Sequence, residues 1–227
     1  MSILIKICGL SAPDALDMAL AAGADMVGFV FFAPSPRNIG YDTARALGQR
    51  VRGRAQKVAL FVDPTDQELT AGIEALEPDM LQLHGAETPD RVVRVRERFG
   101  LSVMKALPIE QRADLAAVKL YEKVADRLIF DARPAREATR PGGLGQSFDW
   151  QLLQNLDTRL PFMLSGGLDV ANVAEALRIT GAPGVDVSSG VERSPGAKDP
   201  EKIRAFLAAV RRIASDSNVA NNAMTGT

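Results

Sequence analysis

The sequence predicts a parallel α/β fold, and a closed (βα)8 TIM barrel is the form of it that the sequence favours. Short apolar runs alternate with longer amphipathic segments eight times within about 215 residues. The chain has 227 residues, of which 46% are hydrophobic, so it can bury one sizeable core. A barrel and an open, doubly wound sheet both satisfy this alternation. The regular eightfold repeat and the short chain favour the barrel.

The expected strands are short apolar runs, rich in β-branched residues and bounded by turn-forming residues. In chain order they are Ile3–Cys8, Met26–Phe32, Lys57–Val62, Met80–His84, Ser102–Leu107, Arg127–Asp131, Phe162–Ser165 and Gly184–Ser188. Each run is short enough to be a strand, and none of the segments between them alternates in the same way. The first and last of these strands would become neighbours if the sheet closes.

Helices are expected between the strands, because apolar residues recur there at spacings of three and four. Pro13 opens the first helix, which ends before Gly23, and Asp66 opens the third. Another helix is expected to close with the apolar residues Val118, Leu120 and Tyr121.

Alternation along the strands predicts which side chains point into the barrel. In the first strand, Ile5 and Ile7 share one face, whereas Lys6 and Cys8 share the other. The isoleucine face should pack against helices, so the face with the charge should point inward. The inward residues nearest the strand ends are then Cys8, His84, Asp131 and Ser188. In a barrel enzyme, those strand ends form the catalytic face.

Charges inside a barrel must be paired, because an isolated buried charge is unfavourable. The inward face of the first strand carries Lys6, and that of the sixth carries Arg127. Asp186 is a candidate partner for Lys6. Lys6 could also favour the thiolate of Cys8, and the sequence leaves these two roles open.

Composition excludes several classes of function. Lys and Arg number 27 and Asp and Glu 28, giving a net charge of -1, so nothing favours binding to nucleic acid or an anionic membrane. No apolar run is long enough to span a bilayer, and the N-terminus does not read as a signal peptide. One cysteine and one histidine predict neither disulfides nor a Cys/His metal site, and they fit a cytoplasmic protein. We expect one barrel domain over residues 1–214 and a disordered tail over 215–227.

Two glycine-containing turns follow the last two strands. Gly166 and Gly167 come after the seventh strand, and Ser188, Ser189 and Gly190 come after the eighth. Backbone N–H groups in such turns can hold a phosphate dianion, and this is the usual phosphate position in a TIM barrel. The alternative is that each is only a tight turn between a strand and a helix.

A long polar loop follows the sixth strand, from Ala132 to about Gln146, and contains Gly142 and Gly143. Loops of this length in compact domains often cover a binding site. Its glycines resemble a dinucleotide-binding pattern only superficially, because they follow a loop instead of a strand. We therefore expect no NAD site.

An ordered set of motifs covers residues 3 to about 212. It consists of Lys6–Leu10, Gly28–Phe32 with Ser35–Arg37, Leu81–Gly85, Phe130–Ala132, Pro141–Gly143 with Asp149–Trp150, Ser165–Leu168 and Val185–Glu192. Together these motifs resemble the phosphoribosylanthranilate isomerase family of tryptophan biosynthesis. The resemblance implies a (βα)8 barrel that converts N-(5-phosphoribosyl)anthranilate to 1-(o-carboxyphenylamino)-1-deoxyribulose 5-phosphate by an Amadori rearrangement.

The resemblance also implies roles for particular residues. Cys8 would be the general base and Asp131 the general acid, and Arg37 would bind the anthranilate carboxylate. Phosphate would be bound by Gly166, Gly167, Ser188, Ser189 and Gly190, and further substrate contacts would come from Gln82, His84, Gly143 and Asp186. It implies no cofactor and no metal, a small phosphorylated substrate as the partner, and either a monomer or a homodimer.

The reaction needs these residue types. Opening the furanose ring requires an acid near the ring oxygen, and the resulting imine makes the C2′ proton acidic enough for a side-chain base. Cys8 must therefore lose a proton, although a thiol with an ordinary pKa near 8.5 is only a few per cent ionised at pH 7. Asp131 must carry a proton when it acts.

Simpler interpretations stand beside these roles. Cys8 could be a packing residue, Asp131 could pair with Arg127, Arg37 could be a solvated charge, and His84 could be a satisfied barrel residue. Other functions also remain, namely another sugar-phosphate barrel or a barrel that only binds phosphorylated metabolites. A metal-dependent epimerase should have several His ligands, and a dual-substrate isomerase of histidine and tryptophan synthesis should have paired aspartates. The single histidine and the Cys8–Asp131 pair argue against both.

Overall fold

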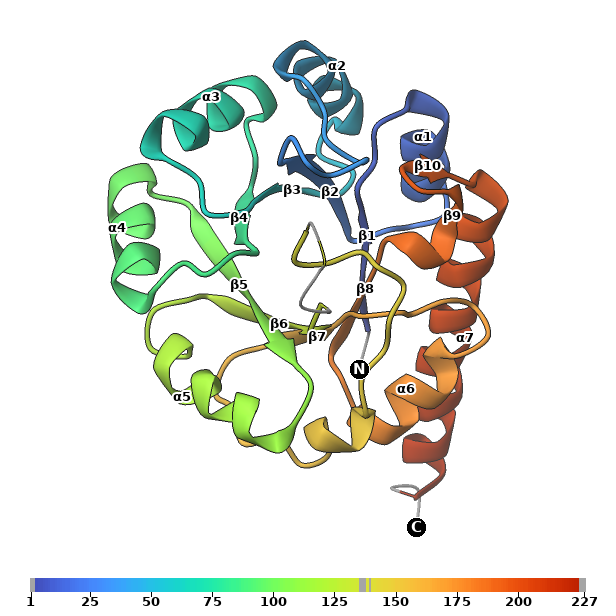
Figure 1. Ribbon diagram of the computed structural model, residues 1–227. Helices are drawn as coiled ribbons and strands as arrows, with labels where there is room; N and C mark the ends of the chain where they lie inside the picture. Colours follow the sequence, from blue (N-terminus) through green and yellow to red (C-terminus); the bar gives the residue numbers. More distant parts are fainter. Residues whose placement is uncertain (1–2, 135–137, 139, 225–227) are drawn as a thin grey trace.

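The computed structural model is a closed barrel of eight parallel strands with helices around it (Figure 1). It describes residues 3–134, 138 and 140–224, and side chains in the last helix are described through residue 214. The strands pair in chain order, and pairing between β1 and β8 closes the sheet. This closure confirms the barrel and excludes the open, doubly wound sheet.

All of the expected strands are present, and their ends lie within two residues of the expected ones. They are β1 (Leu4–Cys8), β2 (Met26–Phe31), β3 (Gln56–Phe61), β4 (Met80–Leu83), β5 (Ser102–Ile109), β6 (Arg127–Ala132), β7 (Phe162–Leu164) and β8 (Gly184–Val187). After β8, β9 (Glu192–Ser194) and β10 (Ala197–Lys198) form a small antiparallel hairpin. The sequence did not predict this hairpin.

The outer layer contains both α-helices and short 3-10 helices. The α-helices are α1 (Pro13–Ala21), α2 (Tyr41–Val51), α3 (Asp66–Leu76), α4 (Pro89–Phe99), α5 (Val118–Tyr121), α6 (Val173–Thr180) and α7 (Pro200–Met224). The 3-10 helices are η1 (Arg112–Ala117), η2 (Trp150–Leu153) and η3 (Ser189–Val191). The expected openings at Pro13 and Asp66 are confirmed, and the Thr65 side chain caps α3 by accepting from Glu68 N.

The helical layer is incomplete in two places. Between β5 and β6 the chain forms η1 and only one turn of α5, and Leu120 is 58% exposed instead of lying on an apolar face. Between β6 and β7 the only regular element in the described residues is η2. The expectation of a full helix there was wrong. Pro141, Gly142 and Gly143 disfavour a helix, and this part of the chain lies over the barrel mouth.

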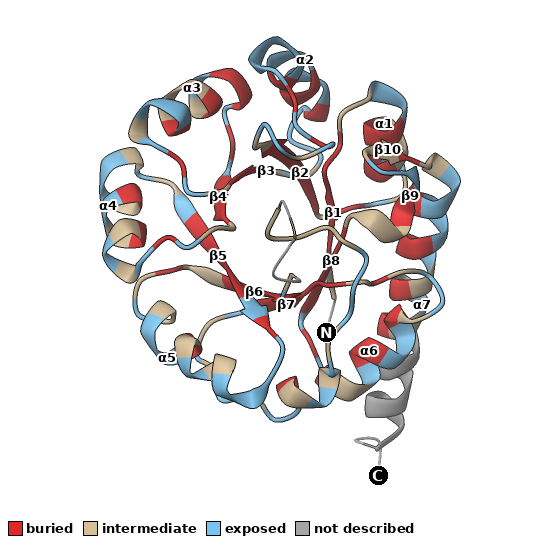
Figure 2. Cartoon of the chain, viewed as in Figure 1, coloured by how far each residue is buried: buried red, intermediate tan, exposed pale blue. Residues whose placement is uncertain are grey.

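The buried residues form layers that follow the strand alternation. Ile5 and Ile7 belong to the cluster between the barrel and its helices, as expected. A second cluster fills the barrel interior with Met26, Val58, Met80, Met104, Ala106, Ile129 and Met163. Above it, Cys8 packs with Val30 and Leu60. Figure 2 shows the strands mostly buried and the outer faces of the helices exposed. Cys8 therefore lies in the interior layer nearest the mouth.

The last helix, α7, lies beside α1 and α6 and reaches Met224 (Figure 1). Side chains of 215–224 and all of 225–227 are outside the described residues. The division into a barrel over 1–214 and a disordered tail over 215–227 therefore stays a prediction. Within the part of the chain that is described, no helix has both the length and the apolar character needed to cross a membrane.

Candidate active site

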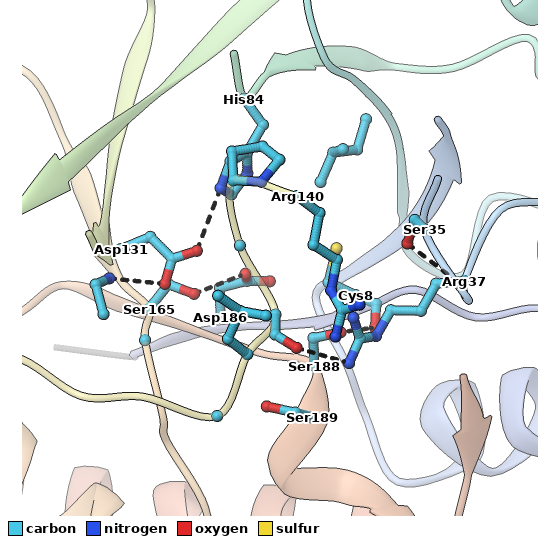
Figure 3. Close-up of a pocket in the computed structure, with 18 of the residues that line it drawn as sticks. Cys8, Ser35, Arg37, His84, Asp131, Arg140, Ser165, Asp186, Ser188 and Ser189 are labelled. Carbon is cyan, nitrogen blue, oxygen red and sulfur yellow. Dashed lines mark hydrogen bonds and ion pairs between the residues drawn. The ribbon is translucent and has the colours of Figure 1, made fainter. Parts of the chain in front are cut away.

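A cavity at the C-terminal end of the barrel brings together the inward residues of four strand ends. Cys8 at the end of β1, His84 just after β4, Asp131 in β6 and Ser188 just after β8 all line it. Arg37, from the loop after β2, lines it too. Figure 3 shows these side chains converging on one space from different elements. Strand alternation alone predicted four of these five residues.

Cys8 is buried beside a glycine that makes room for it. A Cβ at Gly28 would lie 2.9 Å from Cys8 Sγ and 3.2 Å from Lys6 Cε. Burial raises the pKa of the Cys8 thiol; the positive charge of Lys6 lowers it, the carboxylate of Asp186 raises it, and the net shift is upward. Cys8 is therefore mostly a neutral thiol in the substrate-free site at neutral pH.

Lys6 is committed mainly to Asp186. Its Nζ lies 2.8 Å from Asp186 Oδ1, and the two side chains are 0% and 5% exposed. Burial opposes the charge of Lys6, but the combined effects of Asp186 and Cys8 outweigh it and the pKa of Lys6 is raised. The second oxygen of Asp186 accepts from Ser165 Oγ at 3.2 Å. Of the two roles that the sequence left open, pairing with Asp186 is the dominant one, and Lys6 lowers the pKa of Cys8 only partly.

Asp131 contacts a histidine that a buried glutamine holds in place. Asp131 Oδ2 lies 3.2 Å from His84 Nε2, and Asp131 Oδ1 accepts from Ala132 N at 2.9 Å. His84 Nδ1 lies 3.0 Å from Gln82 Nε2. Gln82 is wholly buried and does not line the cavity, so it contacts His84 where a substrate contact was expected.

The alternative pair of Asp131 with Arg127 does not form. Arg127 lies at the opposite end of β6, and its Nε and Nη1 have no hydrogen-bond partner among the described residues. Burial lowers the pKa of Arg127. Asp131 is therefore not occupied by a neighbouring cation on its own strand.

Arg37 is a buried, paired residue, not a solvated one. Its Nε donates to Glu192 Oε1 at 2.7 Å and its Nη2 to Glu192 Oε2 at 2.8 Å, so the two side chains form a two-pronged ion pair. Its Nη2 also donates to Gly143 O at 3.1 Å. The loop that carries it is tied to the residue after β2, because Asn38 Oδ1 accepts from Phe32 N at 2.8 Å. Arg37 is thus held at the edge of the cavity in one orientation.

The glycine-rich loop after β6 lies over the cavity, where Figure 1 shows it crossing the barrel mouth in yellow. Gly143 has a φ of +68°, and a Cβ there would overlap Arg37 Nη1. A Cβ at Gly142 would lie 2.7 Å from both Asp131 Oδ2 and His84 Nε2. Glycine is therefore required at both positions for the loop to come this close to the site.

The two candidate phosphate turns differ in how they meet the cavity. Gly166 and Gly167, with φ of +87° and +61°, line it, as do Ser188 and Ser189. Gly190 does not line it and instead lies so close to Leu168 O that a Cβ at this position would overlap that oxygen. The turns after β7 and β8 thus contribute Gly166, Gly167, Ser188 and Ser189 to the lining of one cavity. Gly190 has a packing role in this structure.

Sequence reasoning missed three charged residues near the cavity. Glu192 holds Arg37, Lys198 in β10 holds Glu192, and Arg140 lines the cavity with a buried Nε that has no partner among the described residues. Glu192 was part of a recognised motif but received no role. The sequence predicted neither the strand that contains Lys198 nor any regular element at Arg140. The directions of these two side chains could therefore not be predicted from a periodic pattern.

The described residues contain no group of three or more His, Cys, Asp or Glu side chains placed to hold a metal ion. Among the residues that line the cavity, Cys8, Asp131 and His84 can transfer protons, and Arg37 can bind an anion. The absence of a cofactor stays an expectation.

Comparison with known proteins gives a consistent result. The family model for N-(5'phosphoribosyl)anthranilate (PRA) isomerase matches residues 5–209. The N-(5'-phosphoribosyl)anthranilate isomerases of Nitrobacter winogradskyi and Rhodopseudomonas palustris (strain BisB5) are 61% and 60% identical over 211 residues. These matches cover 93% of this chain and 94% and 97% of the two relatives, respectively.

Solved structures agree with the sequence matches. The phosphoribosyl anthranilate isomerase of Thermotoga maritima has a TM-score of 0.83 at 30% identity, covering 92% of this chain and 98% of that one. A phosphoribosyl anthranilate isomerase in complex with reduced 1-(o-carboxyphenylamino)-1-deoxyribulose 5-phosphate has a TM-score of 0.80 at 28% identity, with the same coverage. A third structure, with a TM-score of 0.79 at 29% identity and again the same coverage, is of monomers generated from the dimeric Thermotoga maritima enzyme.

Proposed function

This chain belongs to the N-(5'-phosphoribosyl)anthranilate isomerase family, and from that premise we propose that Cys8 is the base and Asp131 the acid of its reaction. The chain is an isomerase of tryptophan biosynthesis that converts N-(5-phosphoribosyl)anthranilate to 1-(o-carboxyphenylamino)-1-deoxyribulose 5-phosphate. This identity decides between the isomerase and the other barrel functions that the residues alone left open. The assignment of each step to a residue is our proposal.

The first step opens the sugar ring. Protonated Asp131 donates its proton to the ring oxygen while the C1′–O bond breaks, and the nitrogen lone pair forms a C1′=N bond. The contact between Asp131 and His84 supports this role. In the observed orientation Gln82 Nε2 faces His84 Nδ1, which places the imidazole proton on Nε2, toward an ionised Asp131.

The buried amide of Gln82 offers a second arrangement. Gln82 Oε1 has no hydrogen-bond partner among the described residues. A half turn of the amide would place Gln82 Oε1 against a proton on His84 Nδ1, and His84 Nε2 would then accept a hydrogen bond from protonated Asp131. The two orientations match Asp131 after and before it gives up its proton. Gln82 and His84 therefore accommodate both charge states that the reaction requires of this acid.

The second step removes the C2′ proton. The Cys8 thiolate takes the proton, the C–H electron pair forms a C1′=C2′ bond, and the nitrogen is neutralised. The resulting enol then loses its O–H proton and gains a proton at C1′, which gives the ketone of the product, and proton exchange with water restores the Cys8 thiolate and protonated Asp131. Because burial raises the pKa of Cys8, the thiolate is a minor species and a strong base once formed. No covalent bond to sulfur is needed.

Binding groups surround these two residues. Arg37 would bind the anthranilate carboxylate, with Gly143 closing the loop over it, and the turns at Gly166, Gly167, Ser188 and Ser189 would bind the phosphate. Asp186, fixed by Lys6, would accept a hydrogen bond from a sugar hydroxyl. The observation that carries the proposal is that the candidate acid, base and anion-binding groups all line one cavity.

The test is a coupled assay that generates the labile substrate in situ and follows the change in anthranilate fluorescence. Cys8→Ala should lower kcat by at least about 100-fold, because a positioned base contributes about 10²–10⁴-fold. Cys8→Ser, which keeps the size of the side chain but is far less acidic, should be nearly as slow. A Cys8→Ala variant with near-normal turnover would remove Cys8 from the mechanism.

We also propose that the protein acts in the cytoplasm on a small phosphorylated substrate, without nucleic acid or membrane, as a monomer or a homodimer. The near-zero net charge of -1 supports the absence of polyanionic partners. The related Thermotoga maritima protein is dimeric. Light scattering of this chain at increasing concentration would distinguish the monomer from the homodimer.

A further inference from the structure

The hairpin after β8 places a buried lysine, Lys198, behind the cavity. The proposed reaction steps give this residue no role. Lys198 Nζ lies 2.7 Å from Glu192 Oε1, and Glu192 in turn binds Arg37 through both of its oxygens. The side chains of Lys198, Glu192 and Arg37 are 1%, 4% and 5% exposed. Two cations and one carboxylate are thus joined in one buried cluster.

This cluster carries a net charge of +1 when all three groups are ionised, because one carboxylate serves two cations. The neighbouring Lys6–Asp186 pair is balanced and does not neutralise it. A buried charge without a counter-ion is unfavourable, so such a cluster is suited to the arrival of an anion. Arg37 is the member that lines the cavity, and an anion would reach the cluster there.

We propose that Lys198 is a positioning residue of the isomerase: by sharing the carboxylate of Glu192, it leaves Arg37 with positive charge for the substrate carboxylate. This inference rests on the proposed role of Arg37. Without Lys198, Glu192 would neutralise Arg37 completely. The incoming carboxylate would then compete with Glu192 instead of completing the cluster.

The same ammonium group also fixes the turn after β8. Lys198 Nζ donates to Ser188 O at 2.9 Å and to Ser188 Oγ at 3.1 Å, and Ser188 Oγ donates to Cys8 O at 3.1 Å. The hairpin also packs against the loop of Arg37, because a Cβ at Gly196 would overlap Pro36 O. Lys198 therefore connects the candidate carboxylate site to one of the candidate phosphate turns.

The charge on this cluster should depend on pH. Burial lowers the pKa of Lys198 to about 8, although Glu192 opposes the shift. The other charged or titratable groups near Lys198 are Arg37, Cys8 and the exposed Lys202, which donates to Glu192 O and is screened by water. Above about pH 8, Lys198 loses its proton and the cluster becomes neutral. Affinity for an anionic ligand should therefore fall through this range.

The experiment is calorimetric titration with reduced 1-(o-carboxyphenylamino)-1-deoxyribulose 5-phosphate, the ligand in the related solved structure. At about pH 7, Lys198→Met should bind at least about tenfold more weakly than the parent. The double variant Lys198→Met/Glu192→Gln restores a net charge of +1 on Arg37 and should recover most of the loss. A structural role alone would make the double variant as weak as the single one or weaker.

Two further variants complete the test. In the Cys8→Ser background, which removes titration of the thiol, the affinity of the protein with Lys198 should fall above about pH 8, and Lys198→Arg should abolish that fall. This pH series decides the question even if Lys198→Met does not fold. Arg37→Met should weaken binding at every pH.

The outcomes separate the two proposals. The proposed role of Lys198 is overturned if a folded Lys198→Met variant binds as tightly as the parent, or if affinity does not fall above about pH 8. Weaker binding by Arg37→Met in the same experiments would keep the proposed role of Arg37. Parent-like affinity of Arg37→Met overturns both.

Discussion

The two ends of the barrel use carboxylates in different ways. At the N-terminal end, Asp25, Asp79 and Asp126 each precede an even-numbered strand and each accept a backbone N–H of the strand before it, from Ile5, Lys57 and Val103 at 2.7, 2.6 and 2.8 Å. At the C-terminal end, Asp131, Asp186 and Glu192 each have a different partner, namely His84, Lys6 and Arg37. One end repeats a single contact, and the other repeats none.

Burial follows the same division. The side chains of Asp25 and Asp126 are 32% and 30% exposed, whereas those of Asp131, Asp186 and Glu192 are 8%, 5% and 4% exposed. At the N-terminal end these carboxylates stay partly hydrated, although Asp25 and Asp126 also pair with Arg211 and Arg96. At the C-terminal end the carboxylates are almost shielded from water, so each needs a specific partner. The repeated carboxylate contacts thus lie at the end of the barrel where they bind the backbone of the strands. The unrepeated contacts lie at the end with the candidate active site.

The largest expected effect tests whether the ion pairs at the C-terminal end of the barrel serve activity alone or also stabilise the fold. Lys6→Met would leave Asp186 buried without its cation, so it should lower the free energy of unfolding by about 3–5 kcal/mol and also reduce activity. The C-terminal end would then contribute to stability as well. Urea unfolding measures the first effect and the coupled assay the second.

A matched control exists on the surface. Arg50 pairs with Asp17 where both side chains are largely exposed, so Arg50→Met should change the free energy of unfolding far less. The double variant Lys6→Met/Asp186→Asn should regain much of the stability but not the activity. If Lys6→Met were as stable as the parent, the Lys6–Asp186 pair would not be the buried ion pair described above.

A smaller effect concerns the pH dependence of the base. Because the pKa of Cys8 is raised, its thiolate should form only above the pH range in which an ordinary cysteine ionises. Cys8 is the only cysteine, so ultraviolet absorbance of its thiolate reports the same ionisation directly, with Cys8→Ser as the blank. A thiolate already present near pH 6 would contradict this account.

The contacts that sequence could predict are those that follow from strand alternation and barrel closure. Lys6 and Asp186 are 180 residues apart, yet pairing of the first and last strands places them directly opposite each other. Alternation likewise directed Cys8 and Asp131 to the same mouth. Here a periodic local pattern and one closure rule determine a long-range contact.

Other contacts had no such rule. Arg37 and Glu192 are 155 residues apart and come from a loop and a hairpin. The directions of their side chains depend on the geometry of turns and not on the alternation of residues along a barrel strand. Lys198 follows the unpredicted turn of that hairpin, so it was missed. The segment between the predicted polar loop and β7 was expected to be a full helix and forms only η2.

The most direct test compares Asp126→Asn with Asp131→Asn, the same change at the two ends of β6. Both carboxylates accept a backbone N–H, at 2.8 and 2.9 Å, and each has one cationic or titratable side-chain partner. We predict that Asp131→Asn lowers kcat by at least about 100-fold with a nearly unchanged free energy of unfolding. Asp126→Asn should lower that free energy by about 1 kcal/mol while kcat stays at the parent value. An Asp131→Asn variant with parent-like kcat, or an Asp126→Asn variant that is folded but equally inactive, would contradict the division between the two ends.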